Sequence, residues 1–250
     1  MFILAYPEDS EHIAYFDSYF NKYIAKGGHL AWRINNPGLV HSHSHVAKKN
    51  GSIGACNAYA IFATPEQGYT ALSDWLQLKK YYNSTIQTVA THYQPNNPEQ
   101  FISRLVSLTD LPRDKELKSL PKYRFEALIK AIAKLCLYTA IGNEELTLLP
   151  KIMGKIESGA TPSYLIGNDI VLSQPEAIGW IQSHRLDASI VHKSNGDVYL
   201  RSRPHHSFCN RGIYDEEPET IDLLPSKKTY RNHCEICRQE KRGSMHLGFY

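Results

Sequence analysis

The hydrophobic pattern of this chain changes at a short run of small residues, Ser158-Gly159-Ala160-Thr161-Pro162-Ser163. Before this run, apolar residues recur at three- and four-residue spacing, as in amphipathic helices. After it, short apolar segments alternate with turn residues, as in strands. Because glycine, proline and serine favour a linker, we expect two domains. A mostly helical domain is predicted over residues 1–157 and a small α+β domain over residues 164–225, followed by a tail over residues 226–250. The expected fold class is therefore α+β.

The N-terminal part carries several helix patterns. The first covers Asp9–Lys26, where Ile13, Phe16, Phe20 and Ile24 follow helical spacing and Gly27-Gly28 would end the helix. A short strand is expected over 58–62. Thr64-Pro65-Glu66-Gln67 then predicts a helix start, because threonine caps, proline suits the first turn and glutamine completes a capping box. Further helices are expected over 85–93, 98–109 and 121–137.

The C-terminal part alternates strand and helix signals. Strands are expected over 164–166 and 170–172, followed by a helix that Ser173 caps. Two more strands, over 188–192 and 198–201, are joined by Asn195-Gly196, which is typical of a tight hairpin.

Composition limits the classes of protein and partner. Hydrophobic residues make up 42% of the 250 residues, and the formal net charge is +3. This charge does not favour nucleic acid as the main partner. No apolar run approaches the roughly 20 residues of a membrane-spanning helix, and the start does not resemble a secretory signal. We expect a chain that is cytoplasmic where it is made, with any export by a signal-peptide-independent secretion system.

The segment between Trp32 and Trp75 is the most distinctive. It contains Asn35-Asn36-Pro37-Gly38 and then Tyr59-Ala60-Ile61-Phe62-Ala63-Thr64-Pro65-Glu66-Gln67-Gly68, with further matching residues to about 110. This order resembles a domain of phage and bacterial cell-wall-associated proteins that is related to lysozyme-like glycan hydrolases. The resemblance implies a helical lysozyme-like scaffold that binds a peptidoglycan-type glycan. It also places Asn35, Asn36 and Tyr59 among the substrate-binding residues.

Hydrolysis would need a carboxylic acid, supported by a second carboxylate or by the acetamido group of the substrate. The candidates are Asp17, Glu11 and Glu66, and Asp17 lies at about the distance before Asn35 that the resemblance implies for the acid. Alternatively, Glu11 and Asp17 are solvated charges and Glu66 favours the dipole of its helix. The chain is thus either a muramidase- or glucosaminidase-like glycoside hydrolase or a non-catalytic relative.

Histidine and cysteine offer further candidates. If His41-Ser42-His43-Ser44-His45 were extended, its three imidazoles would lie on one face and could bind Zn²⁺ or Ni²⁺. A polar surface loop is the alternative. Cys56 is a candidate nucleophile with His41 or His92 as its base, and a buried structural cysteine is the alternative.

The second domain resembles a small bacterial α+β family of unknown function that ends in Tyr-Leu-Arg-x-x-Pro. The match runs from about 165 to 225 and includes Tyr199-Leu200-Arg201-Ser202-Arg203-Pro204. Arg201 and Arg203 share one face of an expected strand, where they could bind a carboxylate or phosphate. A salt bridge within the domain is the alternative.

The tail contains one Cys-x-x-Cys pair, Cys234 and Cys237. Together with Cys209 and His206 it could bind a structural zinc ion, and free thiols in the tail are the alternative. Two functions thus remain open for the whole chain. One is binding, and with it hydrolysis, of a peptidoglycan-type glycan. The other is a non-catalytic secreted effector or adaptor that binds a protein partner.

Overall fold

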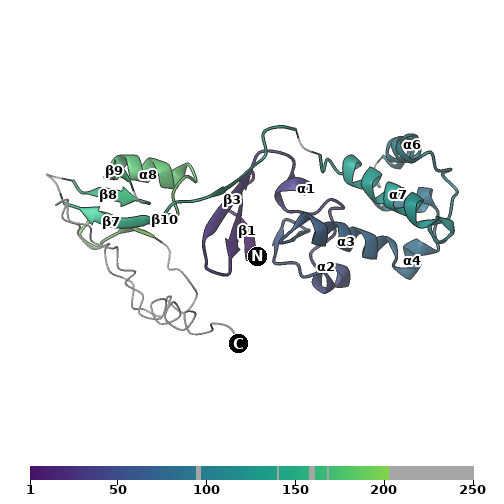
Figure 1. Ribbon diagram of the computed structural model, residues 1–250, viewed down its shortest axis with the longest axis horizontal. Coiled ribbons are helices and arrows are strands. Elements are labelled where there is room, and N and C mark those ends of the chain that lie inside the picture. The colour runs from purple at the N-terminus through teal and green to yellow at the C-terminus, as the bar shows by residue number, and fades with distance from the viewer. Residues whose placement is uncertain (94–96, 140, 158–160, 168, 203–250) are drawn as a thin grey trace, which may run out of the picture. The chain divides into compact units, whose positions relative to one another are not determined.

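The computed structural model describes residues 1–93, 97–139, 141–157, 161–167 and 169–202 (Figure 1). The chain divides into two compact units, each described below by itself. Unit 1 comprises Met1–Ser18 and Tyr23–Thr147, and unit 2 comprises Tyr19–Lys22 and the chain from Leu148. Over the described residues the structure is mixed, with 37% helix and 27% strand in four small sheets. The prediction of a mostly helical N-terminal domain is therefore wrong.

Unit 1 begins with strands where the sequence predicts its first helix. Strands β1 (Phe2–Pro7), β2 (Ile13–Asp17) and β3 (Lys22–Lys26) form a sheet with β6 (Glu145–Leu148), in the order β1-β2-β3-β6. β1 and β2 pair antiparallel, with Ala5 opposite Tyr15. This sheet replaces the helix expected over Asp9–Lys26.

Burial explains why helical spacing misleads in this region. Four consecutive residues of β2, from Ile13 to Phe16, are buried, so apolar residues occupy both faces of the strand. A strand buried on both faces lacks the alternation that separates strand from helix, and its apolar residues then also fit a helical spacing. Phe20 adopts a left-handed conformation with φ of 57°, which interrupts any helix between β2 and β3.

The remaining elements of unit 1 are mostly helices. Strands β4 and β5 form a two-stranded antiparallel sheet in which Gly54 lies opposite Ile61. The predicted helix after Thr64 is confirmed, with the Thr64 side chain accepting a hydrogen bond from Gln67 N–H. The other predicted helices are also confirmed. The bounds are α1 Leu30–Arg33, α2 His45–Lys49, β4 Gly54–Cys56, β5 Tyr59–Ile61, α3 Pro65–Leu76, α4 Lys79–Tyr82, α5 Ile86–Tyr93, α6 Pro98–Thr109, the 3₁₀ turn η1 Leu117–Ser119 and α7 Lys122–Leu135.

Two hydrophobic clusters lie at the two ends of unit 1. One joins the β1–β3 sheet to β5 through Tyr15, Ile34 and Ile61. The other joins helices α3 to α7 around Leu72, Leu105 and other buried side chains. Figure 1 shows α1 and α3 between the sheet and helices α4 and α6.

Unit 2 contains a three-stranded antiparallel sheet, one helix and a hairpin. The sheet has the order β7-β8-β9, and the hairpin joins β10 and β11. Tyr164 is fully buried, and its hydroxyl accepts a hydrogen bond from Leu200 N–H at 3.2 Å. The strands and the Ser173-capped helix predicted here are confirmed. The bounds are β7 Ile152–Ile156, β8 Ser163–Ile166, β9 Ile170–Ser173, α8 Gln174–Gln182, β10 Ala188–His192 and β11 Val198–Ser202.

Within the described residues, no helix has both the length and the apolar character that crossing a membrane requires.

Candidate functional site

The Asn-Asn-Pro-Gly turn packs directly against helix α3. A Cβ atom placed on Gly68 would lie 2.0 Å from the carbonyl oxygen of Asn35 and 2.7 Å from Cδ of Pro37. A Cβ atom on Gly38 would lie 2.6 Å from a methyl carbon of Leu72. The glycines therefore allow the turn and the helix to approach closely, which gives the two parts of this sequence motif a common structural reason.

Asn36 holds the loop that follows this turn. Its side chain is fully buried and donates hydrogen bonds to the carbonyls of Val40 and Ala60, at 3.0 and 2.9 Å. It also accepts one from Val40 N–H at 2.8 Å. Asn35 donates to the carbonyl of Phe62 at 3.1 Å. Both asparagine side chains are thus engaged with the backbone: Asn36 positions the segment that begins at Gly38, and Asn35 holds the chain just after β5.

Backbone pairing with β5 fixes His41. Ala60 N–H donates to the carbonyl of Val40 at 2.9 Å, and Ser42 N–H donates to Ala58 at 2.9 Å. His41 lies opposite Tyr59 in this short pairing, and their ring centroids are 5.4 Å apart. Ser44 then caps α2, which begins at His45, so the alternating histidines do not form one extended face. No group of potential metal ligands found in the described residues contains His41, His43 or His45.

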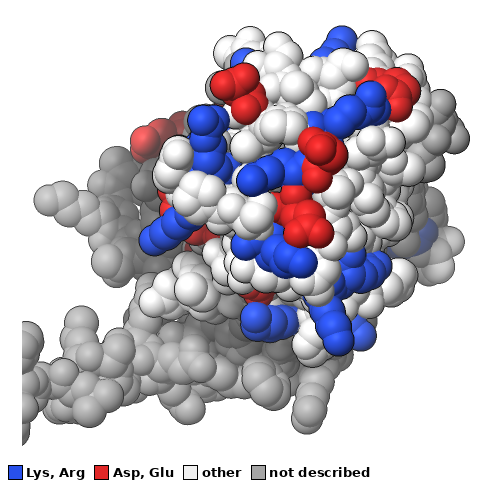
Figure 2. Space-filling model, turned by 90° about the vertical axis from the view of Figure 1, so that its right-hand side faces the viewer, with Lys and Arg blue, Asp and Glu red and all other residues white. Residues whose placement is uncertain are grey.

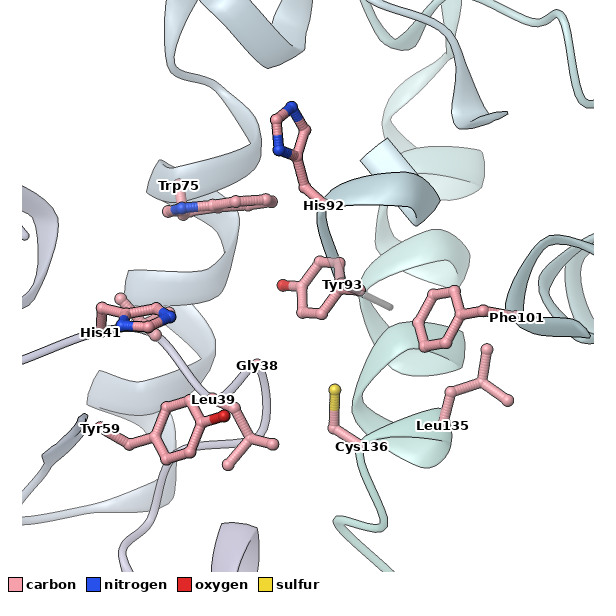
Figure 3. A pocket seen from close by; sticks show the side chains of 11 residues that line it. Gly38, Leu39, His41, Tyr59, Trp75, His92, Tyr93, Phe101, Leu135 and Cys136 are labelled. Carbon is pink, nitrogen blue, oxygen red and sulfur yellow. The ribbon is translucent and has the colours of Figure 1, made fainter. Parts of the chain in front are cut away.

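A pocket of about 170 Å³ opens where this loop meets the helices (Figure 3). It is lined mainly by rings: those of His41 and Tyr59 on one side, Tyr93 and Phe101 on the other, and Trp75 and His92 beside them. The remaining lining residues are Gly38, Leu39, Val40, Leu135 and Cys136. Among these lining residues there is no aspartate or glutamate.

The rings on the helical side form a continuous packed network. Trp75 stacks on Tyr81 with centroids 3.9 Å apart, and it meets Tyr93 edge to face at 5.2 Å. Tyr93 stacks in turn on Phe101 at 5.6 Å, with an interplanar angle of 4°. These contacts come from α3, α4, α5 and α6 and fix the wall of the pocket before any ligand arrives.

The two described cysteines are poor nucleophiles in this fold. Burial raises the pKa of the Cys136 thiol to about 12. Burial also raises the pKa of Cys56, although the positive charge of Arg33 opposes this effect. Both side chains are therefore protonated thiols near neutral pH, whereas nucleophilic catalysis requires a thiolate. The two candidate bases for Cys56 are His41 and His92. Both line the pocket together with Cys136, and Cys56 is not among the lining residues.

The candidate acids lie outside the pocket lining. Glu11 lies in the turn before β2 and Asp17 ends that strand, and neither side chain lines the pocket. Glu66 is exposed at the start of α3, and hydrogen bonds from its own backbone and from Thr64 lower its pKa. A general acid requires the opposite shift.

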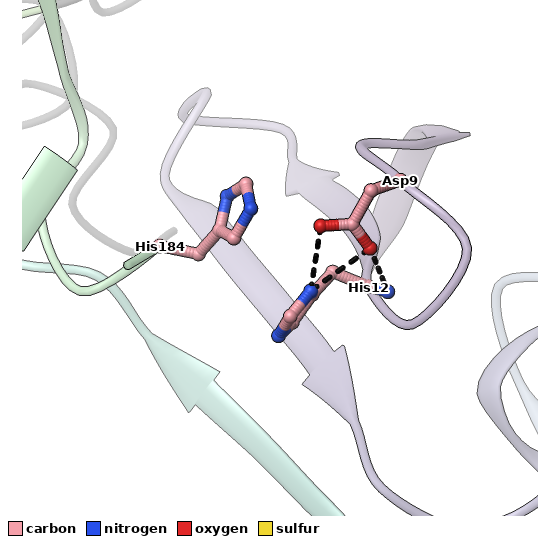
Figure 4. Close-up of side chains that lie close together, drawn as sticks. All are labelled: Asp9, His12 and His184. Atoms are coloured by element: carbon pink, nitrogen blue, oxygen red, sulfur yellow. Dashed lines mark hydrogen bonds and ion pairs between the residues drawn. The ribbon is translucent and has the colours of Figure 1, made fainter. Parts of the chain in front are cut away.

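The turn between β1 and β2 is built around Asp9. Its carboxylate accepts hydrogen bonds from the N–H groups of Glu11 and His12, at 2.7 and 2.8 Å. Figure 4 shows the contacts between Asp9 and His12. Nδ1 of His12 lies 2.9 Å from both carboxylate oxygens. Burial opposes ionisation of Asp9, but these hydrogen bonds outweigh it and lower the pKa to about 2. The ionised group therefore stabilises the hairpin.

The other predicted site residues lie in unit 2 or beyond the described residues. Arg201 is partly exposed on β11, opposite Ser189 of β10. Arg203 and the four tail residues predicted to bind zinc, His206, Cys209, Cys234 and Cys237, fall outside the described residues.

Sequence patterns alone do not indicate the helical wall of the pocket. Trp75 lies in the helix predicted after Thr64, and no motif marks Trp75, Tyr93, Phe101 or Cys136 as a site residue. One signal for this wall is present in the sequence: successive helices carry aromatic residues where aliphatic ones would also fill a core. Ligand pockets are lined predominantly by hydrophobic and aromatic side chains. Comparison of the sequence with known protein families and with curated proteins found no match.

Proposed function

We propose that unit 1 binds a glycan of the peptidoglycan type and does not hydrolyse it. The observation that carries this proposal is the pocket of about 170 Å³, with its ring-lined walls and no carboxylate among its lining residues. A cavity of about 150 Å³ accommodates one benzene molecule, so this pocket has room for about one six-membered ring. It suits a single sugar unit of a longer chain.

The chemistry of the lining matches a pyranose ring. The faces of a pyranose carry C–H groups, which pack favourably on the electron-rich faces of Trp75 and Tyr59. Its hydroxyl groups lie at the rim and need hydrogen-bonding partners. The imidazoles of His41 and His92 and the hydroxyl group of Tyr59 can each donate or accept. The Asn35–Val40 segment supports this role indirectly, because its hydrogen bonds hold His41 beside Tyr59.

Binding and hydrolysis are tested on the same preparation. Binding to purified peptidoglycan is measured by co-sedimentation, and release of soluble muropeptides is measured on the same samples. We expect binding without release. Tyr59→Ala and His92→Ala should each weaken binding by about tenfold, which corresponds to roughly 1.4 kcal/mol, the contribution of one ring contact. Tyr19→Ala is the matched control, because Tyr19 is 76% exposed and does not line the pocket.

Three results would contradict the proposal. If Tyr59→Ala, His92→Ala and Tyr19→Ala all bind like the wild type, the pocket is not the glycan site. If the wild type releases muropeptides and Asp17→Ala or Glu66→Ala abolishes the release, the unit is a hydrolase with its acid outside the pocket. Absence of binding to several wall preparations would remove the glycan function altogether.

A protein partner is the second candidate function, and one observation favours it. Strand β9 lies at an edge of the unit 2 sheet, and its residues Ile170 and Val171 are 44% and 48% exposed. An edge strand with exposed apolar side chains is a template for pairing with a strand of another chain. Ile170→Lys together with Val171→Lys should abolish capture of such a partner and leave peptidoglycan binding unchanged.

A further inference from the structure

A second feature of unit 1 is a group of basic side chains on α4 and on the segment that leads into η1. The two segments lie side by side, because Leu117 N–H donates to the carbonyl of Ser84 and Ile86 N–H donates to that of Lys115, both at 3.0 Å. We call this region the α4–η1 surface. Its exposed basic residues are Lys79, Lys80, Arg113, Lys115 and Lys118, and its acidic residues are Asp114 and Glu116.

Three of these basic side chains form no ion pair with the described residues. Arg113 pairs with Glu99 at 2.8 Å and Lys118 pairs with Glu116 at 3.2 Å. No ion pair within the described residues involves Lys79, Lys80 or Lys115. Figure 2 looks onto the helical end of unit 1 and shows basic side chains spread over this face, with acidic ones between them.

One buried ring, that of Tyr81, connects the α4–η1 surface to the wall of the pocket. Nζ of Lys80 lies 4.4 Å from the centroid of the Tyr81 ring. Tyr81 stacks on Trp75 with centroids 3.9 Å apart and meets His92 at 5.0 Å, and both of these residues line the pocket. Lys80 is therefore one ring removed from the pocket lining, and Lys79 precedes it on the same exposed turn of α4.

We infer that the α4–η1 surface extends the binding site and selects glycans that carry negative charges. This inference rests on the proposed glycan function. A sugar unit in the pocket would place neighbouring units of the same chain within reach of Lys79 and Lys80. Carboxylate or phosphate groups on those units would then meet ammonium groups that form no ion pair with the described part of the chain.

The arrangement of charges favours a glycan over nucleic acid. Duplex DNA carries one negative charge per roughly 1.7 Å of helix axis, so it would bring phosphates against Asp114 and Glu116 as well as against the lysines. An acidic polysaccharide has its charges separated by whole sugar units. It can therefore contact separate lysines without approaching the acidic side chains between them.

The test compares two soluble polymers with the same sugar backbone, neutral glycol chitin and anionic carboxymethyl chitin. Affinities are measured on the full chain at low ionic strength and again near 1 M salt, where the screening length falls to roughly 3 Å. We expect the wild type to bind carboxymethyl chitin about three- to tenfold more tightly at low salt, as a few exposed ion pairs would allow. The preference should disappear at high salt.

Paired variants locate the effect. Lys79→Gln with Lys80→Gln should remove the preference and leave affinity for glycol chitin unchanged. The control is Lys48→Gln with Lys130→Gln, which removes the same charge from exposed lysines of α2 and α7. This control should keep the preference. Thermal unfolding of both variants verifies that they are folded.

The outcomes separate this inference from the proposed function. Equal affinity of the wild type for the two polymers overturns the charge selection and leaves the glycan function standing. Binding to neither polymer overturns the charge selection, and it overturns the glycan function as well if the chain also fails to co-sediment with purified peptidoglycan. The inference also fails if the control loses the preference as much as the test variant, or if His92→Ala leaves carboxymethyl chitin binding unchanged. Tighter binding of single-stranded DNA or of phosphatidylglycerol vesicles would assign the surface to a different polyanion.

Discussion

Replacing Gly68 with alanine should destabilise unit 1, although helix propensity alone predicts that alanine would stabilise α3. Gly68 lies inside α3, where alanine normally stabilises a helix by about 1 kcal/mol relative to glycine. Here the new methyl carbon would lie 2.0 Å from the carbonyl oxygen of Asn35, whereas ordinary contact begins at 3.4 Å. The turn and the helix would have to separate by the difference, 3.4 − 2.0, or about 1.4 Å.

The size of the effect follows from this overlap. Overpacking a well-packed site typically costs about 1–3 kcal/mol, and more when backbone must move. We take about 3 kcal/mol because the atoms in conflict with the new methyl group belong to the backbone of Asn35 and to the ring of Pro37. After subtracting the gain in propensity, the net loss is about 2 kcal/mol. For a unit of this size, such a loss lowers the melting temperature by roughly 4–8 °C.

Gly179→Ala in α8 is the matched control. A Cβ atom at Gly179 meets nothing within 4 Å, so the same substitution should stabilise its helix by roughly 0.5–1 kcal/mol. Urea denaturation followed by circular dichroism compares the two variants. Fluorescence in a Trp180→Phe background reports on Trp32 and Trp75, which both lie in unit 1. If Gly68→Ala proves as stable as the wild type, the close packing of the turn on α3 is refuted.

Three further predictions concern single side chains. Asn36→Ala should destabilise unit 1 by about 2–3 kcal/mol in urea denaturation, because it leaves the buried Val40 N–H without its acceptor; an unchanged midpoint would contradict the role given to Asn36. Folding raises the pKa of Cys136 from 9.0 to about 12, so the stability from its protonated thiol is fully present below pH 9 and is lost as the pH rises towards 12. Cys136→Ala should flatten this alkaline loss of stability, and iodoacetamide should modify the native thiol much more slowly than the unfolded one at pH 8. Folding lowers the pKa of Asp9 from 3.8 to about 2, so its contribution is present above pH 4 and is lost as the pH falls towards 2; Asp9→Asn should reduce the acid dependence of the melting temperature over this range.

Local signals in the sequence were sufficient for the elements that carry their own start and stop residues. Helix α3 begins where Thr64 and Pro65 predict it, and α8 begins after Ser173 with a complete capping box. The β10–β11 hairpin forms around Asn195-Gly196 as its residues predict. In each case the determining contacts lie within a few residues, so they can be read from sequence.

The sheet of unit 1 depends instead on partners that are distant in sequence. β2 is buried on both faces, and β6 joins the sheet from residue 145 onward. The chain from Asp9 to Lys26 contains enough apolar residues for either a helix or two strands. The choice follows from what covers both of its faces, and local propensity does not contain that information.

The sequence by itself determined helices α3, α5, α6 and α7, the strand–helix–hairpin order of residues 164–201 and the Asn-Asn-Pro-Gly turn, because short-range capping, spacing and turn chemistry specify them. Tertiary structure decided what these parts do together. It engaged Asn35 and Asn36 with the backbone, placed His41 beside Tyr59, and brought Trp75, His92, Tyr93 and Cys136 from three helical segments to one pocket. It also kept Glu11, Asp17 and Glu66 out of the lining of that pocket. Such convergence arises from long-range packing of the helices and the loop, which no local pattern encodes.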